Sequence, residues 1–131
     1  MFIKMIIEEN PLSKEEDIEN ECIELVEVKK AVEKLNGDNK TAVILRRDDD
    51  NYMVVGGGAN GKYVVTAVLR SKNYAMANKF DVVKAPIELT VGGKKKNYPS
   101  KRCLNLEMVL EAAKHFADRG ALAQTFNWET N

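Results

Sequence analysis

The sequence predicts an α+β domain, in which an antiparallel sheet of about six to seven strands packs one face against two main helices. Apolar residues recur at helical spacing in two stretches, 27–36 and 106–117. Between 41 and 98, short β-branched and aromatic runs alternate with turns rich in glycine, asparagine and aspartate. A chain of 131 residues, 44% of them apolar, is sized for a single domain. We therefore expect one domain over 1–131, built as a meander with tight glycine hairpins.

The N-terminal part is expected to begin with a strand and to continue into a helix. Residues 2–8 are mostly apolar and predict the strand, and Asn10-Pro11 then opens a polar loop. The first helix is expected over 27–36, and Asn36-Gly37 supplies a left-handed stop at its end. Its apolar stripe consists of Val28, Ala31, Val32 and Leu35. The stretch 22–26 fits a helix and a strand equally well.

The middle of the chain predicts the first strands of the meander. Strands are expected at 41–46, 52–55 and 62–69, and they are separated by Asp48–Asn51 and by Asn60-Gly61. An Asn-Gly pair between two such runs is typical of a tight hairpin, because both central positions of that turn need positive φ.

Three later runs predict further strands of the meander. Strands are expected at 75–83 and 86–91, and a weaker pattern predicts another at 95–98. Gly92-Gly93 lies between the last two runs and predicts a turn. The order of runs and turns therefore favours an antiparallel arrangement.

The final helix has the clearest pattern in the chain. Asn105 is a candidate N-cap and Gly120 a candidate C-terminal stop. Its apolar stripe comprises Leu106, Val109, Leu110, Ala113, Phe116 and Ala117. The tail 121–131 contains Trp128, the only tryptophan. This side chain either packs the tail across the sheet, which is the favoured interpretation, or is exposed as an anchor at an interface.

Composition narrows the classes of function. Basic and acidic residues number 20 each, which disfavours an obligate nucleic-acid binder because phosphate binding needs an excess of Lys and Arg. No run approaches the ~20 apolar residues of a membrane span, and the start of the chain lacks the basic and long apolar regions of a signal peptide. We expect a cytoplasmic protein without a membrane partner. Cys22 and Cys103 lack disulfide-scaffold or metal spacing, so free thiols are favoured over a bridge between them.

One glycine-rich segment matches the pattern of a phosphate-binding loop. Gly56–Lys62 fits G-x-x-x-x-G-K after a strand, but the next residue is Tyr63 instead of Ser or Thr. A phosphate loop must also open a helix, whereas residues 63–68 predict a strand. A hairpin in which Gly58 faces Tyr63 explains the glycines better. Binding of a nucleotide or another small ligand by this loop is the minor alternative.

The residues that catalysis would need do not form a recognisable set. His115, the only histidine, falls beside Glu111 and Lys114 on the polar face of the final helix, and neither cysteine has a nucleophile motif. Asp48–Asp50 lacks the spacing of a calcium loop. We therefore expect no enzyme, no cofactor and no metal site.

Charge is distributed unevenly along the chain. From Glu8 to Glu27, nine acidic residues and one basic residue give a local charge of −8. Between Lys84 and Arg102, six basic residues and one acidic residue give a local charge of +5. Such asymmetry can steer a partner. Two solvated surfaces that partly attract each other explain it equally well.

Several short motifs follow one another in a recognisable order. Leu35-Asn36-Gly37 precedes the strand 41–45, and Tyr52–Gly58 then runs into Gly61–Val65. The later motifs are Val91-Gly92-Gly93, Phe116 with Gly120, Leu122, and Trp128-Glu129. This order resembles the first-numbered immunity-protein family (immunity family one) of bacterial polymorphic-toxin and contact-dependent inhibition systems. The likeness covers roughly residues 24–129, and the N-terminal strand and acidic loop, 1–23, lie largely outside it.

The resemblance implies a small cytoplasmic protein that binds and neutralises the C-terminal toxin domain encoded by a neighbouring gene. Deaminases and other nucleic-acid-modifying toxins are common partners of that family. The resemblance implies no catalysis and no cofactor, and it assigns no binding residues to numbered positions. A secretion chaperone or adaptor, which need not abolish its partner's activity, is a further alternative. We assume a monomer.

We expect acidic residues to contact the toxin, because carboxylates opposite a basic nucleic-acid groove imitate phosphate and accelerate association. The candidate toxin-binding residues are Glu8, Glu9, Glu15, Glu16, Asp17, Glu19, Asp48, Asp49 and Asp50. The alternative places the basic turn Lys94–Lys96 against an acidic toxin.

Overall fold

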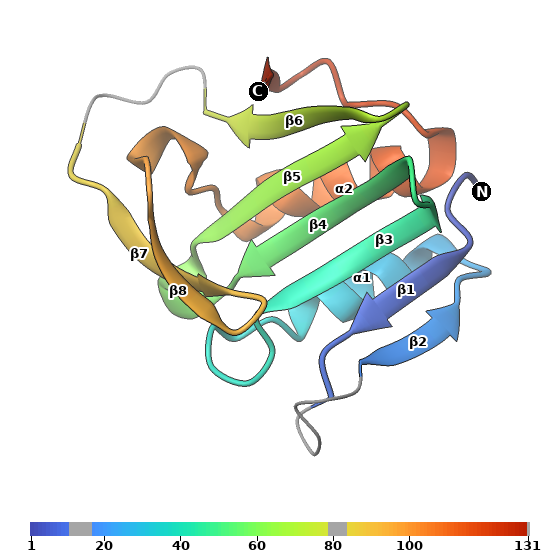
Figure 1. Ribbon diagram of the computed structural model, residues 1–131, viewed down its shortest axis with the longest axis horizontal. Coiled ribbons are helices and arrows are strands. Elements are labelled where there is room, and N and C mark those ends of the chain that lie inside the picture. Colours follow the sequence, from blue (N-terminus) through green and yellow to red (C-terminus); the bar gives the residue numbers. More distant parts are fainter. Residues whose placement is uncertain (11–16, 79–83, 131) are drawn as a thin grey trace.

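The computed structural model of the chain describes residues 1–10, 17–78 and 84–130. Its large sheet is antiparallel and has seven strands in the order β2-β1-β3-β4-β5-β6-β9, while β7 and β8 form a separate two-stranded sheet. Figure 1 shows both helices behind the large sheet and the β7–β8 hairpin in front of one end of it. The expected α+β class, with two main helices on one face of an antiparallel sheet, is confirmed.

The elements have the following bounds. The strands of the large sheet are β2 (Ile18–Glu21), β1 (Met5–Glu8), β3 (Ala42–Asp48), β4 (Asn51–Gly57), β5 (Tyr63–Leu69), β6 (Lys72–Ala77) and β9 (Asn127–Thr130). The hairpin consists of β7 (Ile87–Val91) and β8 (Lys94–Tyr98). The helices are α1 (Leu25–Glu33) and α2 (Leu106–Arg119), and short 3-10 turns lie at Ala59–Gly61 and Ser100–Arg102.

The main core lies between the sheet and the helices. The helical residues buried there are Val28, Ala31, Val32, Val109, Ala112, Ala113, Phe116 and Ala117. They meet a row of side chains that the strand register aligns across four strands: Ile6, Leu45, Met53 and Ala67. Because side chains alternate between the two faces of a strand, the residues between these point to the other face.

The α2 helix begins and ends at the predicted residues, whereas α1 ends at Glu33, before the predicted stop at Asn36-Gly37. Lys34 still has right-handed backbone, with φ of −76°, and the Asn36 and Gly37 N–H groups donate to the Lys40 carbonyl instead of continuing the helix. The Asn105 Oδ1 accepts a hydrogen bond from the Met108 backbone at 2.9 Å, and α2 ends at Gly120 with φ of 65°. These are the predicted N-cap and stop. The α1 helix begins after Glu24, because the Glu27 carboxylate accepts from the backbone N–H groups of Ile23 and Glu24 at 2.7 and 2.8 Å.

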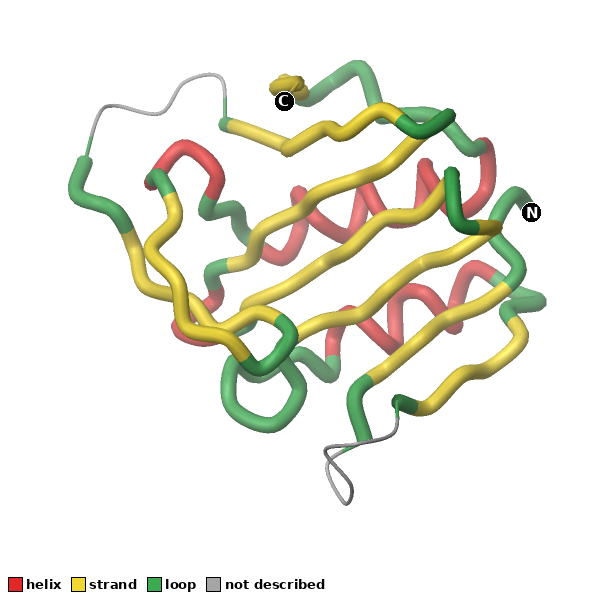
Figure 2. The backbone as a smooth tube through the Cα atoms, in the orientation of Figure 1, coloured by secondary structure: helices red, strands yellow, loops and turns green. Residues whose placement is uncertain are grey.

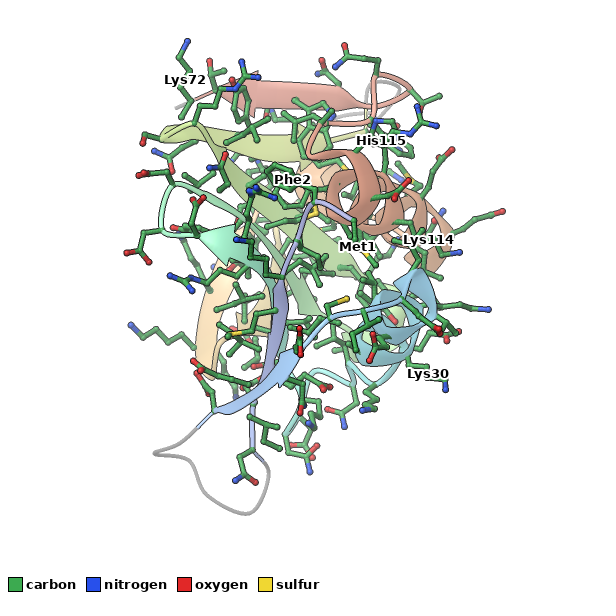
Figure 3. The ribbon with its side chains drawn as sticks, turned by 90° about the vertical axis from the view of Figure 1, so that its right-hand side faces the viewer. Met1, Phe2, Lys30, Lys72, Lys114 and His115 are labelled. Carbon is green, nitrogen blue, oxygen red and sulfur yellow. The ribbon has the colours of Figure 1, made fainter. Side chains whose placement is uncertain are left out.

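The chain enters the fold through Phe2, whose backbone N–H donates to the carbonyls of Ala117 and Asp118 at the end of α2. Its ring meets Phe116 edge to face, with centroids 5.6 Å apart, and the Arg47 guanidinium lies 4.8 Å from its centroid. Figure 3 places Phe2 between the sheet and α2. The strand expected from residue 2 therefore begins only at Met5, since the preceding backbone is bonded to a helix.

The β7–β8 hairpin covers part of the sheet face that the helices leave free. A Cβ at Gly56 would lie 2.4 Å from the side chain of Val91, so glycine is needed where the hairpin crosses β4. Val64, Leu89 and Cys103 form a second, smaller core beneath the hairpin. Figure 2 shows the hairpin lying across one end of the strands; no other helix or strand of the described residues covers the remainder of this face.

Several predicted boundaries differ from the structure. The segments 18–21 and 127–130 form edge strands, although they were expected as loop and tail. The strand expected at 75–83 spans 72–77, and residues 79–83 lie outside the described part of the chain. In the β4–β5 hairpin, Gly57 instead of Gly58 lies opposite Tyr63.

The reason for that last difference is the length of the β4–β5 loop. The Gly58 N–H donates to the Lys62 carbonyl at 2.8 Å, and the intervening residues form a 3-10 turn instead of a two-residue turn. The predicted positive φ values of Asn60 and Gly61 are present, at 55° and 68°.

Candidate functional site

Glu8, one of the predicted toxin-binding residues, points inward. It lies on the same side of β1 as Ile6 and is only 9% exposed. Its carboxylate is 3.5 Å from the Nζ of Lys34 and 3.9 Å from that of Lys40. The charge of Glu8 is therefore used inside the protein, where it offsets two lysines that follow α1.

Glu9 is equally committed to the fold. Its carboxylate accepts hydrogen bonds from the backbone N–H and Oγ1 of Thr41, the latter at 2.8 Å, and from the Ala42 N–H at 2.6 Å. The Lys40 Nζ donates to the Glu9 carbonyl at 2.8 Å. These bonds fix the start of β3 against the end of β1, so this carboxylate has little capacity left for a partner.

Asp17 and Glu19 are the predicted residues that remain available. Both are exposed, and Glu19 lies on β2 opposite Ile7 of β1. Neither carboxylate has a hydrogen bond or an ion pair within the described residues. Glu21 shares this exposure and faces the same way as Glu19, two residues along the strand. Glu15 and Glu16 lie outside the described residues.

The acidic turn Asp48–Asp50 is exposed, but its side chains largely hold the turn together. The Asp48 carboxylate accepts from the Asn51 amide and the Asp50 N–H, both at 2.9 Å, and these bonds lower the pKa of Asp48. Asp49 is ion-paired with Arg46, and Asp50 accepts from the Ser71 hydroxyl at 2.9 Å. This turn is therefore a less concentrated negative surface than its sequence suggests.

A cavity of about 640 Å³ brings some of these groups together. It lies on the sheet face away from the helices, between β1 and β3, the loop 37–39 and the turn of the β7–β8 hairpin. Its charged lining residues are Glu9, Asp17, Asp38 and Lys95, and its apolar lining includes Ile7, Ala42 and Ile44. The Asp48–Asp50 turn does not reach it.

The sequence motifs do not single out Asp38, Glu21 or the apolar residues of this face. Asp38 lies in a loop that Asn36 folds, since the Asn36 Oδ1 accepts from the backbone N–H groups of residues 38, 39 and 40. Nothing in the local pattern signals that this loop approaches β1. The alternation of Ile44 with buried neighbours in β3 is the one signal that indicates a second apolar face.

The Gly56–Lys62 segment connects β4 to β5 and contacts neighbouring parts of the chain closely. It passes through the short 3-10 turn Ala59–Gly61 into β5 and opens no α-helix, in contrast to a phosphate-binding loop. A Cβ on Gly57 would lie 2.8 Å from the Lys62 carbonyl oxygen, and one on Gly58 would lie 2.7 Å from the Leu35 carbonyl oxygen. Gly57 and Gly58 are thus explained by close backbone contacts, and Gly61 by its positive φ of 68°.

The helix side of the molecule has a shallow groove of about 770 Å³ between α1 and α2. His115 lines it together with Glu111 and Lys114, as the helical spacing predicts. Figure 3 shows Lys30, Lys114 and His115 on this side, away from the hairpin. Within the described residues, no group of three or more His, Cys, Asp and Glu side chains is arranged to hold a metal ion.

The two cysteines and the tryptophan are part of the interior. Cys22 and Cys103 are both buried and form no disulfide bond, and burial raises the pKa of the Cys22 thiol. Trp128 packs against the main core, and its Nε1 donates to the Ala123 carbonyl at 3.0 Å. Trp128 therefore closes the core, in agreement with the favoured interpretation. Neither helix in the described part of the chain is long and apolar enough to cross a membrane.

Comparison with known families identifies the chain. The family model described as "Immunity protein Imm1" matches residues 16–130, a range that includes both helices and every described strand except β1. Its match starts at residue 16 instead of the 24 expected from the motifs, and so takes in β2. Comparison with the curated proteins finds no match. The chain belongs to the Imm1 family of immunity proteins.

Proposed function

We propose that this protein binds one cognate toxin domain and neutralises it by stoichiometric protein–protein contact, without a catalytic step. Membership of the immunity-protein family is the observation that carries the proposal, because an immunity protein protects against a toxin. In this proposal the protein acts in the cytoplasm as a single-domain monomer. Its partner is the C-terminal domain of a toxin encoded by a neighbouring gene.

The proposed toxin acts on nucleic acid, as a deaminase or a nuclease would. An enzyme of this kind has a basic groove for its substrate, and a negative surface is attracted to such a groove. Asp17, Glu19 and Glu21 support the proposal, because these carboxylates are exposed and have no ion pair within the described residues. Asp48–Asp50 is proposed as a weaker second contact, since Arg46 offsets part of its charge.

The proposal is tested by co-expression. The toxin domain encoded next to this protein is expressed from an inducible promoter, with and without the immunity protein, and growth is recorded. We expect growth arrest by the toxin alone, rescue by co-expression, and a 1:1 complex on co-purification. A toxin domain that stays lethal although the immunity protein is present and folded would contradict the proposal.

The proposed attraction between the acidic residues of β2 and a basic toxin groove is tested by charge reversal. Glu19→Lys combined with Glu21→Lys is expected to slow association on the order of tenfold at low ionic strength and to flatten its salt dependence. The matched control is Glu33→Lys with Glu111→Lys, which makes the same change in charge on the helix side. Stopped-flow association with an inactivated toxin domain measures both. Equal slowing by the two pairs would show that only net charge matters.

A further inference from the structure

The sheet face away from the helices contains apolar side chains that no described element covers. The strand register aligns Ile7, Ile44 and Val54 across β1, β3 and β4, and continues the row to Thr66 of β5. A neighbouring row contains Met5, Arg46, Tyr52 and Val68. We call these two rows the open face.

The apolar residues of the open face belong to neither core. Met5, Ile7, Ile44, Tyr52, Val54 and Val68 are all partly exposed, and none packs against the helix-side core or the core beneath the hairpin. A contiguous set of half-exposed apolar side chains on four adjacent strands differs from the scattered apolar residues of an ordinary surface. It has the composition of the centre of a protein interface.

The margin of the open face on the β2 side is acidic. The register carries the first row from Ile7 to Glu19 and the second row from Met5 to Glu21. Asp17 and Asp38 line the adjoining cavity, and their carboxylates have no hydrogen bond or ion pair within the described residues. Lys95 is the one basic side chain that lines this cavity within the described residues.

The opposite margin differs in charge. At the far edge of the sheet, Glu129 of β9 is ion-paired with Lys101 and Arg102. Between the two edges, Arg46 of β3 partly neutralises the Asp48–Asp50 turn through its ion pair with Asp49. Unpaired negative charge is therefore concentrated along β2, and a partner that fits must place its positive charge there.

We propose that the open face is the docking surface for the toxin, and that the toxin meets it with an apolar centre flanked on one side by Lys and Arg side chains. The apolar centre covers Ile44 and Val54, and the basic flank lies against Glu19 and Glu21. This inference rests on the proposed function, and it specifies which face binds and what chemistry the partner presents there.

The test places a charge in the centre of the open face. Ile44→Lys is expected to weaken binding of an inactivated toxin domain at least tenfold in a calorimetric titration, because a buried, unpaired ammonium opposes docking. The matched control is Val26→Lys, since Val26 is an exposed apolar residue of α1 on the other side of the molecule. This control is expected to bind as tightly as the unmodified protein.

A second variant keeps the test decisive if Ile44→Lys does not fold. Thr66→Lys adds a charge to the same row at a residue that is already exposed, and it is expected to weaken binding by a similar factor. Thermal unfolding verifies the fold of each variant. Sedimentation of the unmodified protein reports whether the open face holds a second copy instead.

The outcomes separate the two proposals. If the unmodified protein neither rescues growth nor binds, the proposed function fails, and the inference fails with it. If the unmodified protein binds while Ile44→Lys and Thr66→Lys bind equally well, only the open face is rejected. A dimer that Ile44→Lys dissociates would assign the face to self-association. If the lysine variants weaken binding while reversal of Glu19 and Glu21 leaves association unchanged, the basic flank is rejected.

Discussion

At the scale of single residues, two glycines bring two loops into backbone contact. A Cβ on Gly37 would lie 2.6 Å from the Cβ of Ala59, and one on Gly58 would lie 2.7 Å from the carbonyl carbon of Leu35. Both glycines have positive φ, at 75° and 108°. The Leu35-Asn36-Gly37 motif and the glycines Gly56–Gly58 therefore meet in one contact. This contact holds the loop between α1 and β3 against the loop between β4 and β5.

A pair of alanine substitutions in the β4–β5 loop separates the cost of backbone strain at positive φ from the cost of a steric clash with the other loop. Gly61→Ala is expected to lower the free energy of unfolding by about 1–2 kcal/mol, the cost of left-handed backbone for an L-residue, because nothing lies within 4 Å of its Cβ position. Gly58→Ala should cost clearly more, since its Cβ also meets the Leu35 backbone. Urea unfolding measures both variants. If both variants lost the same free energy of unfolding, the contact between the two loops would contribute nothing to stability.

At the scale of elements, β9 is held at the sheet edge by a charged contact as well as by its backbone. Glu129 accepts from the Nζ of Lys101 at 2.6 Å and from the Nε of Arg102 at 2.9 Å. These two cations, Lys101 first, lower the pKa of Glu129 below its ordinary value of 4.5. The contact joins the 3-10 turn after β8 to the last strand.

The lowered pKa predicts a pH-dependent contribution to stability. The carboxylate has a lower pKa when the protein is folded, so its stabilisation is present above the ordinary pKa and is lost as the pH falls through the folded value. Glu129→Gln should therefore be less stable than the unmodified protein near neutral pH, and the difference should shrink in acid. Chemical unfolding at a series of pH values measures this. A difference that is as large in acid as at neutral pH would contradict the role of the charge.

Sequence patterns predicted the elements with a strong period and missed those without one. The α2 helix was predicted with its cap and stop because its apolar stripe spans three turns. The strands β2 and β9 were missed because each has only four residues with little alternation, and they exist through pairing with β1 and β6. Local propensity contains no information about such pairing.

The same limit applies to the candidate site. Counting acids along 8–27 treats Glu8 and Glu19 alike, yet the pleat turns Glu8 toward Lys34 and Lys40 and leaves Glu19 in solvent. A shift of one residue in register would reverse such assignments. Asp17 and Asp38 line the same cavity because the loop 37–39 lies beside β1, and no periodic pattern encodes that placement.

At the scale of the whole molecule, the sheet separates two surfaces of different kind. One face is covered by α1 and α2, and the β7–β8 hairpin is the one described element that lies over the other face, at one end of it (Figure 1). The strand β1 lies between β2 and β3 although it precedes the range matched by the family model. Residues outside the matched range therefore form a strand inside the sheet, and its side chains contribute to both faces.

Adjacent isoleucines of β1 allow the two faces to be compared within one strand. Ile6 is 4% exposed and packs against the helix-side core, so Ile6→Ala should lower the free energy of unfolding by about 2–5 kcal/mol. Ile7 is partly exposed on the open face, and Ile7→Ala should cost less than about 1 kcal/mol while weakening toxin binding. Urea unfolding and calorimetric titration with the toxin domain measure the two effects. If Ile7→Ala destabilises the protein as much as Ile6→Ala does, the open face is covered in solution and is not a docking surface.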